Sequence, residues 1–112
     1  MTDHDDGGLG DYAELADMVR YEADSVVSRV LQRDERGVMT LFAFAEGQGL
    51  TEHSTPHEAA IQVLEGEVSI EMEGEVHRVK TGNMQYLPAG VPHTLLGGAP
   101  FKMLLLISKE PR

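Results

Sequence analysis

Five histidines are the side chains of this chain best suited to metal or acid–base chemistry. Two of them flank a proline in Glu52–Glu58, and a third follows the turn-forming run Pro88–Pro92. The chain has no cysteine, which excludes disulfides, thiolate zinc sites, iron–sulfur clusters and cysteine nucleophiles. Neutral imidazoles bind zinc at about 2.0–2.1 Å and also suit iron, copper and nickel. We therefore expect His53, His57 and His93 to converge on one divalent metal.

The other two histidines carry weaker signals. His4 lies in a polar amino-terminal stretch, and His77 lies between Val76 and Arg78 in an expected strand. A solvated strand face is the simpler interpretation of His77. Neither residue is assigned to the site.

The elements that must position these histidines are predicted to be strands. Short apolar runs are separated by Gly and Pro, and Val68–Met72 alternates apolar with polar residues. Phe101–Ile107 is almost wholly apolar, which is typical of a strand buried on both faces. We expect Met39, Met84 and Met103 in the core. By residue number, the expected strands are 26–31, 38–45, 59–64, 68–72, 75–80, 86–87, 94–96 and 101–107.

Many short strands without a long helix indicate an all-β sandwich or barrel. The one helical pattern lies in Asp11–Tyr21, where Tyr12, Leu15 and Val19 fall at helical spacing. A short helix or an extended edge segment would both satisfy this pattern.

Two stretches of the chain resemble the two sequence motifs of the cupin family. Gly47–Gly66 is similar to the first motif, Gly-x5-His-x-His-x3,4-Glu-x6-Gly, and Gly82–Gly97 is similar to the second, Gly-x5-Pro-x-Gly-x2-His-x3-Asn. Both motifs occur in order, and together they cover nearly half of the chain. The resemblance implies a small single-domain cupin of the RmlC-like, cupin type-2 kind. Its fold would be an all-β double-stranded β-helix, or jelly-roll barrel.

The family usually binds its metal through the two His and the Glu of the first motif and the His of the second. His53 and His93 match two of these four positions. Thr55 stands at the second His position, Ala59 at the Glu position, and Gly97 where the second motif ends in Asn. Half of the usual ligand set is therefore replaced.

Nearby residues offer incomplete substitutes for the missing ligands. In a regular strand His57 would share the face of His53, but Pro56 lies between them. Glu58 is offset by one residue from the usual Glu position, so without a bulge it would point to the opposite face. Gln62 would also point away from the site, and we expect it at a sheet–sheet or dimer contact.

The resemblance implies a barrel that holds a small molecule and can hold a divalent metal such as Fe, Mn, Ni or Zn. A metal-dependent oxygenase, isomerase or lyase is one interpretation, with Tyr86 as a candidate acid, base or hydrogen-bond donor. A non-catalytic binding or sensing module with a degraded metal site is the alternative, which the residues at Thr55 and Ala59 favour. A third alternative is a dimer whose role lies in partner contact.

The family commonly forms homodimers, and we expect one here. Arg29 and Arg33 lie on an early strand beside a strongly acidic segment, and the Gln62 face could be buried between subunits. These features predict association between copies of the chain.

The acidity is concentrated at the amino terminus. The chain has 112 residues with 19 acidic and 9 basic side chains, a net charge of −10. Residues 1–24 hold eight acidic residues and one basic residue, or −7, which leaves −3 for residues 25–112. Such a charge repels nucleic-acid phosphates and anionic lipids, so neither is an expected partner.

The domain organisation is expected to be simple. We expect residues 1–10 to be a disordered acidic arm and residues 11–112 to form one barrel domain. No signal peptide is recognisable, and the longest apolar run, Met103–Ile107, is too short to cross a bilayer. We expect a cytoplasmic location.

Overall fold

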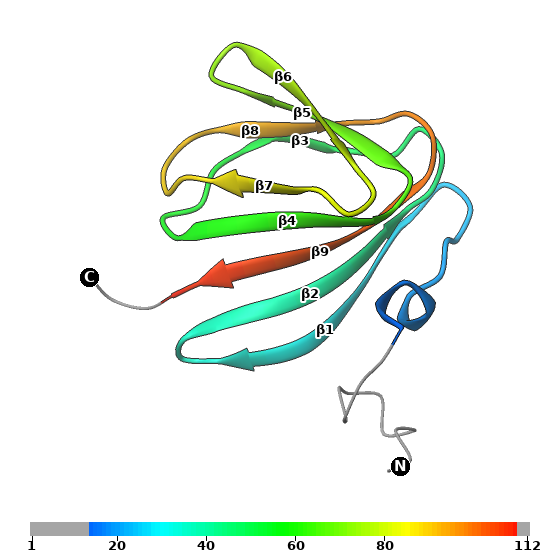
Figure 1. The fold of residues 1–112 in the computed structure, drawn as a ribbon, viewed down its shortest axis with the longest axis horizontal. Helices are drawn as coiled ribbons and strands as arrows, with labels where there is room; N and C mark the ends of the chain where they lie inside the picture. Colours follow the sequence, from blue (N-terminus) through cyan, green and yellow to red (C-terminus); the bar gives the residue numbers. More distant parts are fainter. Residues whose placement is uncertain (1–13, 110–112) are drawn as a thin grey trace.

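The computed structural model describes residues 14–109, and this part of the chain consists mainly of β-strands (Figure 1). A single 3₁₀ turn, η1, precedes the strands. The elements are η1 (Leu15–Met18), β1 (Val26–Asp34), β2 (Gly37–Phe44), β3 (Leu50–His53), β4 (Glu58–Glu65), β5 (Glu67–Met72), β6 (Glu75–Lys80), β7 (Met84–Leu87), β8 (His93–Leu96) and β9 (Phe101–Ser108). Within residues 14–109, no helix has the length and apolar character needed to span a membrane.

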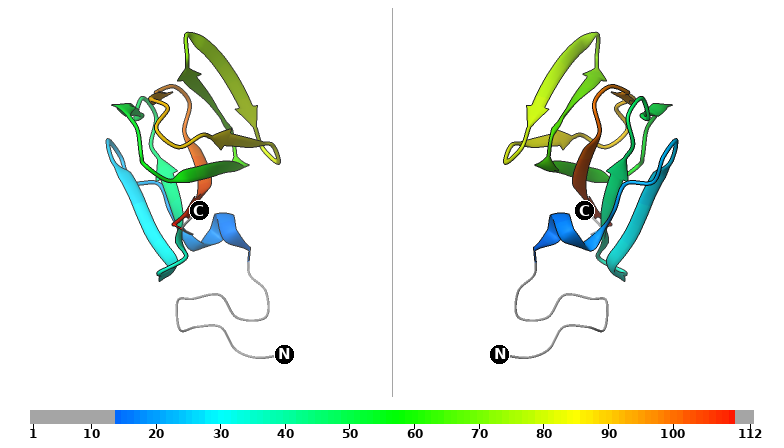
Figure 2. Two further views of the ribbon diagram at one scale, coloured as in Figure 1. Left: turned by 90° about the vertical axis from the view of Figure 1, so that its left-hand side faces the viewer. Right: turned by 90° about the vertical axis from the view of Figure 1, so that its right-hand side faces the viewer.

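The strands form two antiparallel sheets that together make a double-stranded β-helix. One sheet has five strands in the order β1-β2-β9-β4-β7, and the other has four in the order β3-β8-β5-β6. The β1–β2 and β5–β6 hairpins lie at opposite ends of the molecule (Figures 1 and 2). The jelly-roll architecture predicted from the sequence is confirmed.

The main core lies between the two sheets and is built by strict alternation along the strands. In β4, Ala59, Ile61 and Val63 are buried toward the core, while the residues between them face outward. Phe44 and Phe101 stack within this core, with ring centroids 4.4 Å apart. Alternation of this kind buries one face of each strand.

A second cluster covers part of the outer face of the five-stranded sheet. Residues 15–21, which we call the N-terminal strap, bring Val19 against Leu41, Ala43 and Leu104. Val19 is only 4% exposed. The strap explains why the first half of β9 is buried on both faces, as its sequence predicted.

Two cations attach the strap to the sheet through its backbone. Arg29 donates from Nη1 to the carbonyl oxygen of Met18 at 3.0 Å. Lys102 donates from Nζ to the carbonyl oxygen of Ala16 at 2.6 Å and lies 5.1 Å from the centroid of the Tyr21 ring. Arg29, which the sequence placed near a subunit contact, therefore has a role within its own chain.

The β5–β6 hairpin illustrates how local sequence sets the strand register. Met72 and Glu75 pair across a two-residue turn formed by Glu73 (φ 54°) and Gly74 (φ 81°). Two successive positive φ values are the requirement of a type I′ turn, whose twist matches that of the flanking strands. The alternation predicted for Val68–Met72 is confirmed in β5.

Four points of the sequence analysis need correction or limitation. For Asp11–Tyr21 the sequence left a short helix and an extended segment open, and the described part forms only the 3₁₀ turn η1, because Val19 is already extended (φ −144°). Strand β3 was not predicted, since its sequence is mostly polar and three of its four residues are exposed. Met84, expected in the core, is 57% exposed because it occupies an outward position of β7. The acidic arm, residues 1–10, lies outside the described residues.

Candidate functional site

His53 and His93 meet at one end of the barrel. His53 ends β3 and His93 begins β8, and the two residues are direct partners in the antiparallel ladder. Their Nε2 atoms are 3.1 Å apart, and the rings meet edge to face with centroids 4.3 Å apart. Strand pairing thus unites two residues that are 40 positions apart in the chain.

Backbone carbonyl groups set the orientation of both rings. The Nδ1 atom of His53 lies 2.8 Å from the carbonyl oxygen of Thr51, and that of His93 lies 3.2 Å from the carbonyl oxygen of Val91. A carbonyl oxygen only accepts hydrogen bonds, so we assign the ring hydrogen to Nδ1 in both histidines. In the neutral rings each Nε2 is then an acceptor, and the two lone pairs point into the same space.

Two facing acceptors repel each other until something positive lies against them. A proton, a metal ion or the donor group of a bound molecule would each relieve the repulsion. His93 is 4% exposed, and this burial lowers the pKa of its imidazole, which the neighbouring His53 lowers further against the opposing effect of the Val91 carbonyl. The buried member of the pair is therefore held in its neutral, accepting form near pH 7.

The histidine pair borders a small cavity between the two sheets. The cavity has a volume of about 90 Å³, enough for only a few water-sized groups. Its side chains are apolar except for His53, Thr55 and His93. The apolar lining consists of Leu50, Ala59, Ile61, Leu87, Leu95, Met103, Leu105 and Ile107. The cavity therefore combines three polar side chains, those of His53, Thr55 and His93, with an otherwise apolar lining.

The two replaced ligand positions face this cavity. Thr55 and Ala59 are both among its lining residues, and Ala59 is 5% exposed. Glu58 lines a separate cavity on the outer face of the sheet, as the one-residue offset predicted. Gln62 also occupies an outward position, two residues from the equally outward Ala60. Neither the Glu58 nor the Gln62 side chain replaces the missing carboxylate.

His57 lies outside the histidine pair. It belongs to residues 54–57, the connection between β3 and β4, and it does not line the cavity. Its backbone N–H donates to Oγ1 of Thr55, and the carbonyl oxygen of Thr55 accepts from the N–H of Gly90. Among residues 14–109, no three His, Cys, Asp or Glu side chains gather closely enough to hold a metal ion.

Two imidazoles alone do not make a donor set that fits a resident divalent metal. Structural zinc sites use four protein ligands, and catalytic sites usually use three. The positions from which the family draws further ligands carry a hydroxyl group, at Thr55, and a methyl group, at Ala59. We therefore derive no reaction step through a metal at this site.

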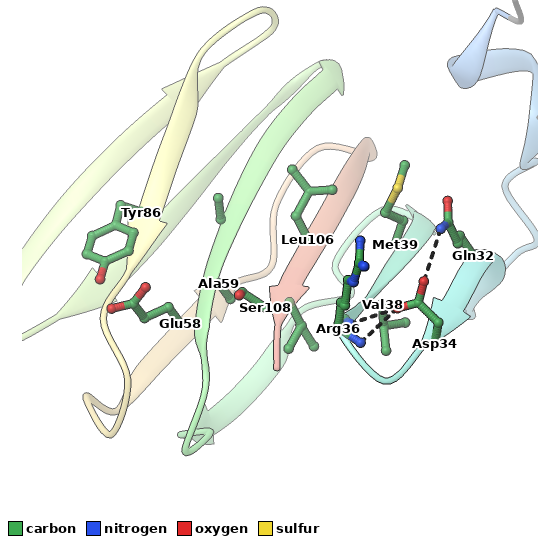
Figure 3. Close-up of a pocket in the computed structure, with 13 residues that line it drawn as sticks. Gln32, Asp34, Arg36, Val38, Met39, Glu58, Ala59, Tyr86, Leu106 and Ser108 are labelled. Atoms are coloured by element: carbon green, nitrogen blue, oxygen red, sulfur yellow. Dashed lines mark hydrogen bonds between the residues drawn. The ribbon is translucent and has the colours of Figure 1, made fainter. Parts of the chain in front are cut away.

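Tyr86 is separated from the histidine pair by the β-sheet. Its neighbour Leu87 points into the small cavity, so Tyr86 points to the opposite face of β7, where it is 51% exposed. There it lines a larger cavity of about 510 Å³ on the outside of the five-stranded sheet (Figure 3).

Sequence reasoning missed the groups that orient the rings. The carbonyl oxygens of Thr51 and Val91 each precede a histidine by two residues. Any residue type supplies such a carbonyl, so no sequence signal marks these positions. The sequence predicted the apolar β9 residues only as core residues, and not as the lining of a cavity.

Comparisons with known proteins agree with this fold. The family model for the cupin domain matches residues 40–107. A conserved protein of unknown function from Streptococcus pyogenes is 34% identical, with a TM-score of 0.81 over 88% of this chain and 86% of that one. A cupin 2 conserved barrel domain protein from Leptotrichia buccalis is 36% identical, with a TM-score of 0.80 over 84% of this chain and 46% of that one.

A cupin superfamily protein from Desulfitobacterium hafniense, 24% identical, matches the fold with a TM-score of 0.86 over 91% of this chain and 95% of that one. A search of curated proteins found no match. The family model covers more than half of the chain, and the barrel architecture is shared with these structures. The chain therefore belongs to the cupin family.

Proposed function

We propose that this cupin binds a small, largely apolar molecule that carries a hydrogen-bond donor, such as a hydroxyl or protonated amine group. One observation supports the proposal above others: the paired Nε2 acceptors of His53 and His93 border an otherwise apolar cavity. A donor atom about 2.7–3.2 Å from both nitrogens would lie beside the line that joins them. An amine would donate one hydrogen to each nitrogen, and a hydroxyl would share its single hydrogen between them. The apolar part of the ligand would lie against the side chains of the two sheets.

This proposal favours a non-catalytic binding or sensing role. Removal of apolar surface from water contributes about 25 cal/mol per Å², from which the entropic cost of association is subtracted, and a hydrogen bond fixes the orientation of the ligand. The cavity of about 90 Å³ limits the enclosed part of the ligand to a few heavy atoms. Any larger part of the ligand would extend through the end of the barrel at His53, which is exposed.

A thermal-shift screen with short-chain alcohols and amines tests the proposal. A molecule that binds only the folded state raises the unfolding midpoint. The shift should disappear in His53→Ala and His93→Ala, and should persist in His77→Ala, a half-buried histidine of β6 outside the site. Equal shifts in all four proteins would contradict the proposal.

A metal-dependent enzyme of oxygenase, isomerase or lyase type is the second candidate. Two nitrogen ligands about 2.0–2.1 Å from one ion, at an angle of about 90–110°, are about 2.8–3.4 Å apart. The Nε2 separation of 3.1 Å lies within that range. His57 would be the third ligand, and it would reach the ion only if residues 54–57 rearranged.

Metal analysis separates the two candidates. The purified protein is incubated with Fe, Mn, Ni or Zn, desalted and measured for bound metal. One equivalent that is lost in both His93→Ala and His57→Ala would support the second candidate. A wild-type protein that retains no metal would eliminate it and leave the binding role.

We also propose that the chain forms a homodimer in the cytoplasm. The dimer follows from the family and from the outward, half-buried position of Gln62. The location follows from the sequence alone. Light scattering of the purified chain tests the dimer, and a monomer would contradict it.

A further inference from the structure

Thr55 adds a third hydrogen-bonding group to the small cavity, beside the two imidazoles. It lines the cavity together with His53 and His93, and the other lining side chains are apolar. A hydroxyl group differs from the accepting Nε2 atoms because it can donate a hydrogen bond as well as accept one. The cavity therefore offers one donor next to a pair of acceptors.

Two hydrogen bonds hold Thr55 in place beside the cavity. Its Oγ1 atom accepts from the backbone N–H of His57 at 3.2 Å, and its carbonyl oxygen accepts from the N–H of Gly90 at 2.8 Å. The first bond is the local side-chain to backbone bond that Thr forms in turns. The second ties residues 54–57 to the connection between β7 and β8. Together they limit the movement of the hydroxyl group relative to the cavity.

Within residues 14–109, the hydroxyl hydrogen of Thr55 has no acceptor. The bond from His57 uses a lone pair of Oγ1 and leaves this hydrogen available. Thr55 is half-buried against a mainly apolar lining. Because a polar group that is removed from water without a partner is unfavourable, the cavity favours a ligand that brings an acceptor to Thr55.

The lining of the cavity favours an uncharged ligand. Among the described residues that form it, no Asp, Glu, Lys or Arg side chain is present to pair with a charge. Transfer of an unpaired ion from water into apolar surroundings is strongly unfavourable. A carboxylate would also place acceptor oxygens against two accepting Nε2 atoms. An ammonium group would match both nitrogens but would leave the Thr55 hydrogen without an acceptor.

We propose that the ligand carries a primary carboxamide group, whose NH₂ group donates to His53 and His93 and whose carbonyl oxygen accepts from Thr55. This inference rests on the proposed binding role and narrows its ligand class. A primary carboxamide is uncharged and has two N–H donors and a carbonyl acceptor on one carbon atom. Each donor matches one Nε2 atom, and the acceptor matches the hydroxyl group. The cavity of about 90 Å³ leaves space for only a short alkyl chain beside this group.

A set of matched small ligands tests this assignment in the wild-type protein. Propionamide has the two donors and the acceptor, butanone has a methyl group in place of the NH₂ group, and propylamine lacks the carbonyl oxygen. NMR titration of the backbone amide resonances measures the dissociation constant of each. We expect propionamide to bind at least about fivefold more tightly than either of the others, because each lost hydrogen bond weakens binding by about this factor.

Thr55→Val removes the hydroxyl group and keeps a side chain of similar size. It should weaken propionamide binding about fivefold or more and leave propylamine binding unchanged. Thr55→Ser keeps the hydroxyl group and should retain the wild-type affinity. Thr94→Val is the matched control, because Thr94 follows His93 on the opposite face of β8 and does not line the cavity. The carbonyl carbon of bound propionamide should resonate at the same position in the wild type and Thr94→Val, and at a different one in Thr55→Val.

The outcomes separate this assignment from the proposed binding role. A protein that binds none of the short-chain alcohols, amines and amides overturns both, and so does one that binds butanone as tightly as propionamide. Propylamine that binds at least as tightly as propionamide, or an unchanged propionamide affinity in Thr55→Val, overturns only the carboxamide assignment. Thermal unfolding without ligand identifies a loss of folding in Thr55→Val. In that case, the three-ligand comparison in the wild type and Thr55→Ser decides the outcome.

Discussion

The Nε2 atoms of His53 and His93 face each other at 3.1 Å, while backbone carbonyl groups hold the opposite nitrogen of each ring. In the proposed binding role, this relationship would let the site bind a ligand without the family's complete metal-ligand set. Two imidazoles with their hydrogens on Nδ1 offer a pair of acceptors to one bound group. In the proposed binding role, the pair would recognise a donor, and the apolar cavity would limit the size of the molecule that carries it.

Restoring the two missing ligands should create a metal site. Thr55 and Ala59 line the same cavity as the histidine pair, so Thr55→His and Ala59→Glu together add ligands directed toward it. We expect the double variant to bind Zn or Mn at least about tenfold more tightly than the wild type. Without metal it should lose about 3 kcal/mol or more of unfolding free energy, because the new carboxylate is buried.

The measurement is metal content together with unfolding in the presence and absence of the ion. Gln62→Glu is the matched control, because this residue occupies an outward position of the same strand. If the double variant gains no metal-dependent stability, Ala59 and Thr55 are not directed at the histidine pair as described.

Lys102 should anchor the N-terminal strap. Its Nζ donates to the carbonyl oxygen of Ala16 at 2.6 Å, and Lys102→Met keeps most of the apolar stem while removing this donor. We expect a loss of about 1–3 kcal/mol in unfolding free energy. Hydrogen exchange of residues 15–21 should become faster. Lys80→Met, an exposed position, provides the control, and equal exchange in the two variants would refute the anchor.

The Asp34 carboxylate should make the β1–β2 turn sensitive to acid. Hydrogen bonds from the backbone N–H of Arg36, from Gln32 and from the N–H of Gly37, together with the positive charge of Arg36, hold the pKa of Asp34 below its ordinary value of 3.8. The folded state therefore binds this proton less readily than the unfolded state. Its stabilising contribution is complete above the unfolded pKa and is lost as the pH falls through the folded pKa.

An NMR titration of the Asp34 carboxyl group measures this shift directly. In Asp34→Asn the unfolding free energy should vary less steeply below about pH 4 than in the wild type. A titration midpoint at or above 3.8 would show that the turn does not stabilise the ionised form.

Much of the barrel could be predicted from the sequence because its strands obey simple alternation. Val68, Ile70 and Met72 are buried in β5 as their spacing indicated. The resemblance to the two cupin motifs implied that His53 and His93 belong to one site, and the structure brings their Nε2 atoms within 3.1 Å. Periodicity and motif spacing both involve residues that lie close together in the sequence, so both can be recognised in a single sequence.

Other features depend on contacts that no local pattern encodes. Strand β3 is mostly polar and is held by its pairing with β8. Met84 is exposed because its side chain lies on the outward face of β7. We expected His57 to join the histidine pair on the assumption that a regular strand ran through Pro56. Residues 54–57 instead form the connection between β3 and β4, and His57 lies outside the pair. The ring orientations depend on backbone carbonyls, which every residue has.

The central claim is that His53 and His93 together accept a hydrogen bond from a ligand donor. The most direct measurement is an NMR titration of the imidazole nitrogens with a short-chain alcohol and, separately, with its methyl ether, which cannot donate. We predict that the alcohol shifts the Nε2 resonances of both histidines and that the ether does not. Equal shifts with the two compounds, or shifts confined to His57 and His77, would contradict the claim.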